Sequence, residues 1–292
     1  MREKRSDGWR RGIAAAFLTT LGLALGAVSL VLGTGCGGID AFHTDMEDIV
    51  EPSRLKYEDT NLSAAALEER MKEIDASFAE PRTPAKVKLS HETSMQSISK
   101  VNGYAALWRG ARACAWLARN DSDRSERKRF AEAGISMGKE AVKRSSTLVE
   151  SYYYYALSLG AFAELKGTPT RDTVRDMRDT IVMALALDPK YDHCGPHRFI
   201  GLLMVKSAGY PLYAVGTPEE GLKHLETATR ECPDYAENNL VYAEALKQEG
   251  QYAQAREELE KVIASARPKD RSAEHDAWLE QANELLQDLQ GS

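Results

Sequence analysis

The chain has 292 residues, of which 43% are hydrophobic and 28% are charged, as in an ordinary soluble globular protein. Its formal net charge is −6. The first 35 residues hold five basic and two acidic side chains, so the remaining chain carries a net charge of −9. A folded part of that sign argues against binding to the phosphates of a nucleic acid.

The N-terminal residues have the pattern of a bacterial lipoprotein signal. A basic stretch ends at Arg11, an uncharged run extends from Gly12 to Ile39, and Cys36 follows small residues within that run. We expect residues 1–35 to be a signal peptide that is cleaved before Cys36, which would then carry lipid. The alternative is an uncleaved signal anchor, because the run is long enough to span a bilayer. Both interpretations place the folded part outside the cytoplasm.

Residues 36–60 are polar and have no steady period, so they are predicted to be a tether, and residues 61–292 to be the folded domain. Cys114 lies in an apolar helical segment, where a buried thiol is expected. Cys194 precedes the first helix of a predicted pair and Cys232 ends the second, so antiparallel packing would bring both to one edge. The sequence is compatible with a disulfide between them, in an oxidising compartment, or with two free thiols.

Apolar residues recur with a helical period along most of the domain. No segment alternates with period two for long, so essentially no sheet is expected. A capping threonine, a proline and a glutamate at 217–220 mark one helix start clearly. Helices are predicted at residues 63–80, 93–120, 126–143, 145–165, 170–187, 196–207, 217–232, 236–266 (two helices joined by a turn) and 272–289.

The C-terminal half repeats a small–large spacing that is typical of tetratricopeptide (TPR) repeats. Ala184, Ala228 and Val262 each follow a large apolar residue by three positions and precede a proline by five or six. Antiparallel helices pack closely where small residues lie, and the proline ends the second helix. The sequence therefore predicts an all-α, TPR-like solenoid of about four helix pairs, closed by an amphipathic C-terminal capping helix.

One unit of this predicted solenoid is interrupted by an insertion at residues 208–216. Loops that lengthen a regular unit without adding to a core usually serve recognition. Tyr210 and Tyr213 give this loop aromatic surface, and Arg198 on the preceding helix offers a fixed positive charge. Trp108 and Tyr155 lie on first helices of other pairs, which line the concave face of such solenoids.

These five residues suggest an apolar cleft with one charged end, suited to an amphipathic carboxylate or to the acidic rim of a partner. The competing interpretation is that Arg198 pairs with a nearby acid while the tyrosines pack the core. His193, Cys194 and His197 could in principle bind zinc, but Gly195-Pro196 interrupts the helix that would align them, so a helix-entry turn is the preferred interpretation. No catalytic motif is found, and we expect no enzymatic activity, no metal and no cofactor.

Several segments between Tyr104 and Ala264 resemble the T-component (TatT) family of TRAP-transporter-associated lipoproteins. The most specific is Gly195-Pro196-His197-Arg198-Phe199-Ile200-Gly201, which is followed by the insertion. Leu107-Trp108-Arg109 and Asn238-Asn239 also fit. Two positions depart from the family pattern: Cys194 replaces a common glycine, and Ser207–Pro211 is a variant of a lysine-alanine-proline loop.

The resemblance implies a lipid-anchored, TPR-like protein that faces the periplasm. It further implies a homotrimer, a periplasmic solute-binding protein as partner, and a channel that passes or holds a small hydrophobic ligand. The leading hypothesis is therefore a non-enzymatic accessory protein of a TRAP-type solute uptake system. The alternative is a TPR scaffold for protein–protein assembly in the cell envelope, with no role in transport.

Overall fold

The computed structural model describes residues 62–99, 103–167, 169–210, 212–265 and 272–290. These residues form eleven α-helices, and the described ranges contain no strand. The all-α prediction is confirmed. The helices are α3 (Ala64–Phe78), α4 (Pro84–Ser97), α5 (Tyr104–Asn120), α6 (Arg124–Arg144), α7 (Val149–Lys166), α8 (Arg171–Leu187), α9 (Tyr191–Ser207), α10 (Pro218–Glu231), α11 (Ala236–Gln248), α12 (Tyr252–Ala264) and α13 (Ala273–Gln290).

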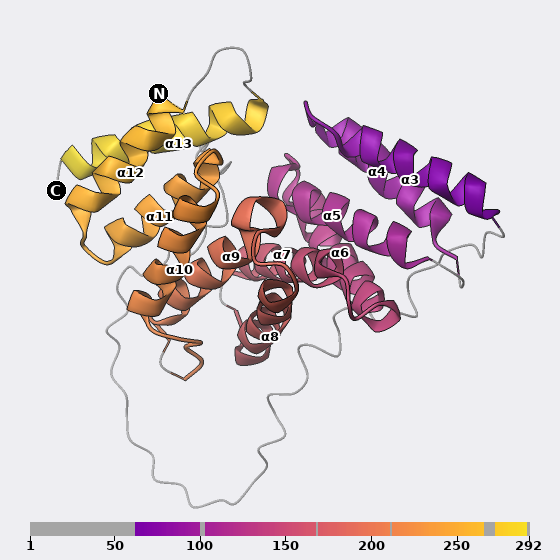
Figure 1. Cartoon of the computed structure of the whole chain (residues 1–292), viewed down its shortest axis with the longest axis horizontal. Coiled ribbons are helices and arrows are strands. Elements are labelled where there is room, and N and C mark those ends of the chain that lie inside the picture. The colour runs from indigo at the N-terminus through magenta and orange to yellow at the C-terminus, as the bar shows by residue number, and fades with distance from the viewer. Residues whose placement is uncertain (1–61, 100–102, 168, 211, 266–271, 291–292) are drawn as a thin grey trace, which may run out of the picture.

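Successive helices pack as antiparallel pairs that stack along an arc (Figure 1). The pairs are α3–α4, α5–α6, α7–α8, α9–α10 and α11–α12, and α13 packs on the last pair. This is the helical-hairpin solenoid with a capping helix that the sequence predicts. The solenoid curves so far that the start of α13 returns to the first pair, where Glu274 meets Arg82.

The N-terminal part differs from the prediction, because residues 93–120 form two helices instead of one. Helix α4 begins at Pro84, where Thr83 caps the helix and accepts a hydrogen bond from Lys86 N–H. It ends at Ser97. Near this end, serine hydroxyls donate hydrogen bonds to the backbone carbonyls four residues earlier, as Ser97 does to Thr93. Such bonds compete with the helix backbone. The break adds a fifth pair to the four that were predicted.

Small residues mark the close crossings of helices. The predicted contact positions Ala141, Ala184, Ala228, Ala255 and Val262 are all fully buried, which confirms the repeat register. Even one methyl group would not fit at some crossings without movement of the neighbouring helix, as between Gly201 and Gly221. These small residues fix how tightly the pairs stack.

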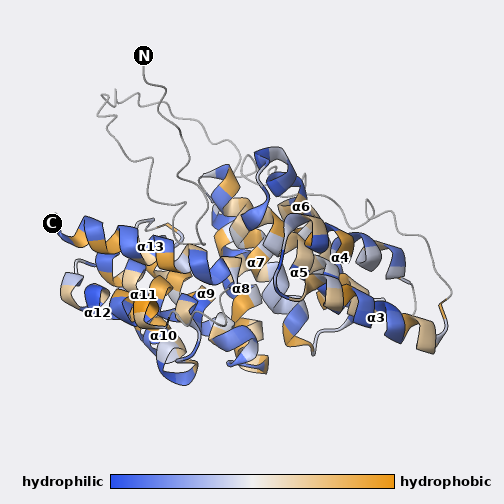
Figure 2. Cartoon of the chain, turned by 90° about the horizontal axis from the view of Figure 1, so that it is seen from above, coloured by the Kyte–Doolittle hydropathy of each residue, from blue (hydrophilic) through white to orange (hydrophobic). Residues whose placement is uncertain are grey.

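The C-terminal cap is amphipathic, with hydrophobic and hydrophilic residues both present along α13 (Figure 2). Leu279, Ala282 and Leu289 of α13 are buried against α11 and α12. This side of the helix closes the core of the last pair, while its other side is exposed. No helix in the described part of the chain has both the length and the apolar character needed to cross a bilayer.

Candidate binding cavity

A cavity of about 1160 Å³, counted with its open mouth, lies on the concave side of the solenoid. Its walls come from the first helix of every pair and from the capping helix, because first helices face inward in this architecture. The lining is both aromatic and charged. Its charged and aromatic residues are Phe78, Arg82, Arg112, Trp116, Arg119, Tyr153, Tyr154, Asp192, Arg198, Phe199, Tyr235, Glu237, Glu274 and Trp278.

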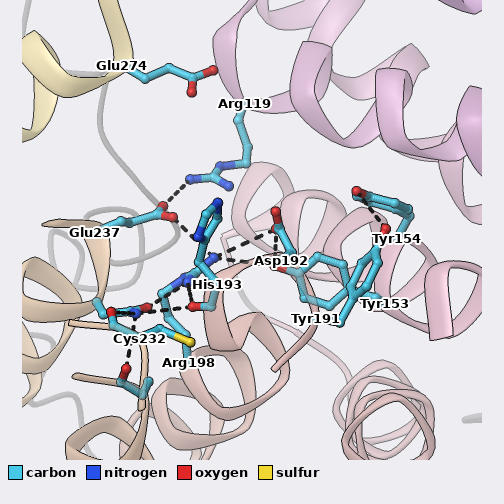
Figure 3. A network of polar contacts seen from close by, with 12 residues as sticks. Arg119, Tyr153, Tyr154, Tyr191, Asp192, His193, Arg198, Cys232, Glu237 and Glu274 are labelled. Atoms are coloured by element: carbon cyan, nitrogen blue, oxygen red, sulfur yellow. Dashed lines mark hydrogen bonds and ion pairs between the residues drawn. The ribbon is translucent and has the colours of Figure 1, made fainter. Parts of the chain in front are cut away.

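Glu237 forms the centre of a buried ion-pair network in the cavity wall (Figure 3). Its carboxylate lies 3.0 Å from Nη2 of Arg119 and 3.3 Å from Nη2 of Arg198. Burial alone would raise the pKa of Glu237, but the two guanidiniums outweigh it and hold that pKa below its usual value. The network joins α5, α9 and α11, so it fixes the two arms of the arc to each other.

Neighbouring residues accept hydrogen bonds from most of the guanidinium N–H groups of Arg198. It donates to Asn238 Oδ1 at 2.7 Å and to the carbonyl of His193 at 3.2 Å. Asn238 in turn donates to the carbonyls of His193 and Cys232. These bonds tie the start of α9 to the start of α11, which makes Arg198 a structural element of the wall.

The start of α9 has an unusual backbone. Asp192, His193 and Cys194 all have positive φ, between 47° and 63°, a region that non-glycine residues rarely adopt. The turn directs the Asp192 carboxylate into the cavity wall, where it accepts a hydrogen bond from the Tyr153 hydroxyl at 2.7 Å. Gly195 follows, and any side chain there would overlap the Tyr153 ring.

This turn is also held covalently. Cys194 is joined to Cys232 by a disulfide, with the two Cα atoms 6.0 Å apart. His193 stacks on Tyr235 at a centroid distance of 4.3 Å, and His197 contacts His224 through their Nδ1 atoms at 2.9 Å. Each of the three residues considered for zinc therefore has another partner. Within the described residues, no group of three or more metal-type side chains could hold an ion.

The first turn of α13 forms one side of the cavity and contacts the opposite side. Glu274 accepts hydrogen bonds from Nη1 of Arg82 at 2.6 Å and from the indole Nε1–H of Trp116 at 2.5 Å. Arg82 and Glu274 are 192 positions apart in the sequence. One carboxylate thus connects the last helix to the first two pairs.

A second, smaller cavity of about 460 Å³, again counted with its open mouth, lies on the other side of α9. It is almost entirely apolar, lined by Val174 and Met177 of α8 and by the stacked rings of Tyr210 and Tyr213. Phe199 and Leu202 line both cavities. They therefore form a shared wall between a polar, aromatic space and an apolar one.

Buried charges lie beside this wall. Burial raises the pKa of Glu164 to about 7, although Lys206, Arg119 and Arg127 oppose the shift. Burial likewise raises the pKa of Glu244, and it lowers the pKa of Lys206 against the attraction of both acids. Because the pKa of Glu164 is raised to about 7, the charge of this cluster changes with pH near neutrality.

The structure does not bring the five predicted ligand residues into one cleft. Arg198 lines the polar cavity, whereas Tyr210 and Tyr213 line the apolar one. Trp108 stacks beneath Tyr154, with centroids 6.1 Å apart, and Tyr155 packs against Gly138 of α6. Neither Trp108 nor Tyr155 lines either cavity. Cys36 lies outside the described residues.

The helical phase of α7 explains the error over Tyr155. Four successive tyrosines point in four directions around a helix, and it is Tyr153 and Tyr154 that face the polar cavity. Arg198 pairs with acids, as the competing interpretation held. Sequence reasoning missed Arg82, Arg119 and Glu274 because their partners are far away in the chain.

Comparison with known proteins supports the fold. A family model described as Regulator of microtubule dynamics protein 1-3 matches residues 71–195, and a tetratricopeptide repeat model matches residues 212–273. The crystal structure of TTC0263, a thermophilic TPR protein of Thermus thermophilus, is similar with a TM-score of 0.55 and 18% identity. The similarity covers 76% of this chain and all of that one. No curated protein matches significantly.

The chain is a TPR-like protein. This architecture suggests a scaffold for protein–protein interaction, and proteins of this type are generally not enzymes. Both family models leave out α13 beyond its first residue. The contact of Glu274 with Arg82 and Trp116 therefore lies outside the stretch that the repeat model matches.

Proposed function

We propose that the protein is a membrane-anchored, periplasm-facing accessory component of a TRAP-type solute uptake system. In this proposal it binds a periplasmic solute-binding protein and a small hydrophobic ligand. The observation that carries the binding role is the concave cavity, which every first helix and the capping helix line with aromatic and charged side chains. The transport role rests on the resemblance of residues 104–264 to the TatT lipoproteins.

Two structural features support the binding of a hydrophobic ligand. The apolar cavity is bordered by the inserted loop at residues 208–216, whose stacked Tyr210 and Tyr213 lie at one side. Leu212 of the same loop is 86% exposed, which is unusual for a leucine and suits contact with a partner or a ligand. An amphipathic molecule could place its chain against Phe199 and its polar end towards the charged cavity.

The location rests on the sequence of the first 36 residues. A lipid on Cys36, followed by a polar tether, would hold the domain close to the membrane surface. The disulfide between Cys194 and Cys232 suits an oxidising compartment such as the periplasm. A homotrimer, which the family resemblance implies, is part of the same proposal.

Two binding assays test this function on the full-length chain. The first measures cis-parinaric acid binding by fluorescence, for the native chain and for Tyr213→Ala. The second measures capture of a purified periplasmic solute-binding protein of a TRAP-type system. We expect both to bind the native chain, and Tyr213→Ala to weaken the fatty acid about tenfold.

The alternative function, an envelope scaffold without a role in transport, predicts a different pattern. In that case neither cis-parinaric acid nor the solute-binding protein would bind, while envelope proteins would still be captured through the concave face. A folded Tyr213→Ala variant with unchanged fatty-acid affinity would remove the apolar cavity from the proposal.

A further inference from the structure

The contact between Glu274 and the opposite rim of the cavity has the geometry of a bound carboxylate. Two donors from different helical pairs converge on it, the guanidinium of Arg82 at 2.6 Å and the indole N–H of Trp116 at 2.5 Å. Charge-assisted hydrogen bonds of this length are among the stronger ones in proteins. These two donors together form a carboxylate site, called the seat below, which can bind any carboxylate that reaches both of them.

The seat is built independently of Glu274. Arg82 is held by its own bond from Nε to the carbonyl of Phe78 at 3.1 Å, and its guanidinium lies 4.7 Å from the Phe78 ring centre. Arg112 lies against the same ring at 4.1 Å. A seat whose donors are already positioned loses little entropy when it binds a ligand.

Arg112 adds an unused donor to this wall. Its Nη2 is taken by Asp75 at 2.7 Å, but its Nε–H is buried and has no hydrogen-bond partner. Buried donors are nearly always satisfied in folded proteins. Arg112 lines the cavity, so a small shift of its side chain would offer this Nε–H to a ligand oxygen. Glu274 accepts hydrogen bonds from Arg82 and Trp116, whereas the Nε–H of Arg112 in the same wall remains unused.

Helix α13 does not depend on this contact for its position. Leu279, Ala282 and Leu289 already bury one face of the helix against α11 and α12. Glu274 lies in the first turn, beyond that packed face, and is about one-fifth exposed. Releasing its carboxylate from the seat would therefore leave the cap in place and free both donors for another carboxylate.

We propose that Arg82, Arg112 and Trp116 form a carboxylate-binding site at the cavity mouth, and that Glu274 occupies this site as an internal stand-in until an incoming carboxylate displaces it. This inference rests on the proposed binding role of the cavity and names the ligand chemistry. The carboxylate belongs either to an organic acid or to an acidic side chain of the partner protein.

Direct competition provides the test. Binding of two fluorescent probes is measured with the full-length chain: cis-parinaric acid for the organic acid, and a fluorescein-labelled pentaglutamate peptide for the acidic partner. Their uncharged counterparts, methyl cis-parinarate and a pentaglutamine peptide, report binding that does not need a carboxylate. Glu274→Ala removes the internal occupant, so we expect at least one carboxylate probe to bind about fivefold tighter or more.

The controls separate competition from a change in net charge or fold. Glu260→Ala removes an exposed acid from the neighbouring helix α12 and should leave all affinities unchanged. Arg82→Met in the Glu274→Ala background should return carboxylate affinity to the native level or below. Glu274→Gln keeps the side-chain volume and should show a smaller gain, which protects the test if Glu274→Ala is unstable.

Three outcomes would overturn the inference. They are no gain for either carboxylate probe in both Glu274 variants, an equal gain for the uncharged probes, and no binding of any carboxylate to any variant. Capture of the solute-binding protein is measured in parallel. If that capture persists without a gain in carboxylate affinity, the proposed function stands and this inference falls, whereas a gain without capture gives the reverse.

Discussion

Arg119 of α5 and Glu237 of α11 form an ion pair of 3.0 Å across 118 positions of sequence. Glu237 is buried and also faces Arg198 at 3.3 Å. The pair therefore connects the second helical pair with the fifth, across the concave side of the arc. Because it lies in the cavity wall, it couples the shape of the cavity to the curvature of the solenoid.

Glu237→Gln should destabilise the protein strongly. The substitution leaves the buried guanidinium of Arg198 and the partly buried one of Arg119 without the counter-charge that they share. Breaking a buried pair in this way costs about 3–5 kcal/mol. Urea unfolding followed by circular dichroism measures the loss. Glu257→Gln on the exposed face of α12 is the matched control and should change stability by less than about 0.5 kcal/mol. A loss below about 1 kcal/mol for Glu237→Gln would contradict the role assigned to the network.

Gly195→Ala should disturb the turn that starts α9. The added methyl group would overlap the Tyr153 hydroxyl and ring, so Tyr153 must move away from Asp192. We expect a loss of about 1–3 kcal/mol, as for other overpacked sites. Gly209→Ala is the control, because its nearest neighbour would be 3.9 Å away. Equal melting temperatures for the two variants would show that Tyr153 can move to make room for the methyl group without a loss of stability.

Ala228→Leu tests the repeat register. Ala228 is fully buried where α10 packs in the solenoid, and three extra carbons there should cost about 1–3 kcal/mol. Ala253→Leu makes the same change at an exposed position of α12 and should be nearly neutral. Thermal unfolding of both variants provides the comparison. An unchanged melting temperature for Ala228→Leu would mean that the small-residue positions do not control the crossing.

Glu164 should make stability depend on pH. Its folded-state pKa of about 7 lies above the ordinary value of 4.5, so the folded protein binds more protons than the unfolded chain between these values. Stability contributed by this group is therefore present below about pH 4.5 and is lost as pH rises towards 7 and above. Glu164→Gln should remove that loss and raise stability on the order of 2 kcal/mol at pH 8, relative to the native chain.

The measurement for Glu164 is urea unfolding of both chains at pH 5 and pH 8. The difference between them should be clearly smaller at pH 5, where most of the native carboxyl is protonated. Glu257→Gln, at an exposed position, should show no such pH dependence. If Glu164→Gln is less stable than the native chain at pH 8, attraction to Lys206 outweighs burial and the pKa of Glu164 is not raised.

Cys36→Ser tests the anchor that the N-terminal sequence predicts. Without the thiol no lipid can be attached, so we expect either a soluble form or an uncleaved precursor. Membrane fractionation and mass spectrometry of the native and variant chains distinguish these outcomes. An intact leader in the native chain would instead establish the uncleaved signal anchor.

The sequence by itself determined the repeat architecture. Ala184, Ala228 and Val262 are buried as their spacing predicts, because close packing of two helices allows only small or compact residues at the crossing. The cap at α13 was equally predictable, since its apolar face has a helical period. Helix α4 was missed because its polar side chains hide the period, with Ser90, Thr93, Ser94 and Ser97 buried through hydrogen bonds to backbone carbonyls or tight packing.

Only the tertiary structure decided the site. Arg198 was a candidate from sequence, but its partner Glu237 and the rim contact between Arg82 and Glu274 were not. Local patterns report which face of a helix is buried, because burial follows the 3.6-residue period. They do not report which charges meet across a cavity, because that depends on the curvature summed over all pairs, and small changes in each crossing move the two ends of the arc by many ångströms.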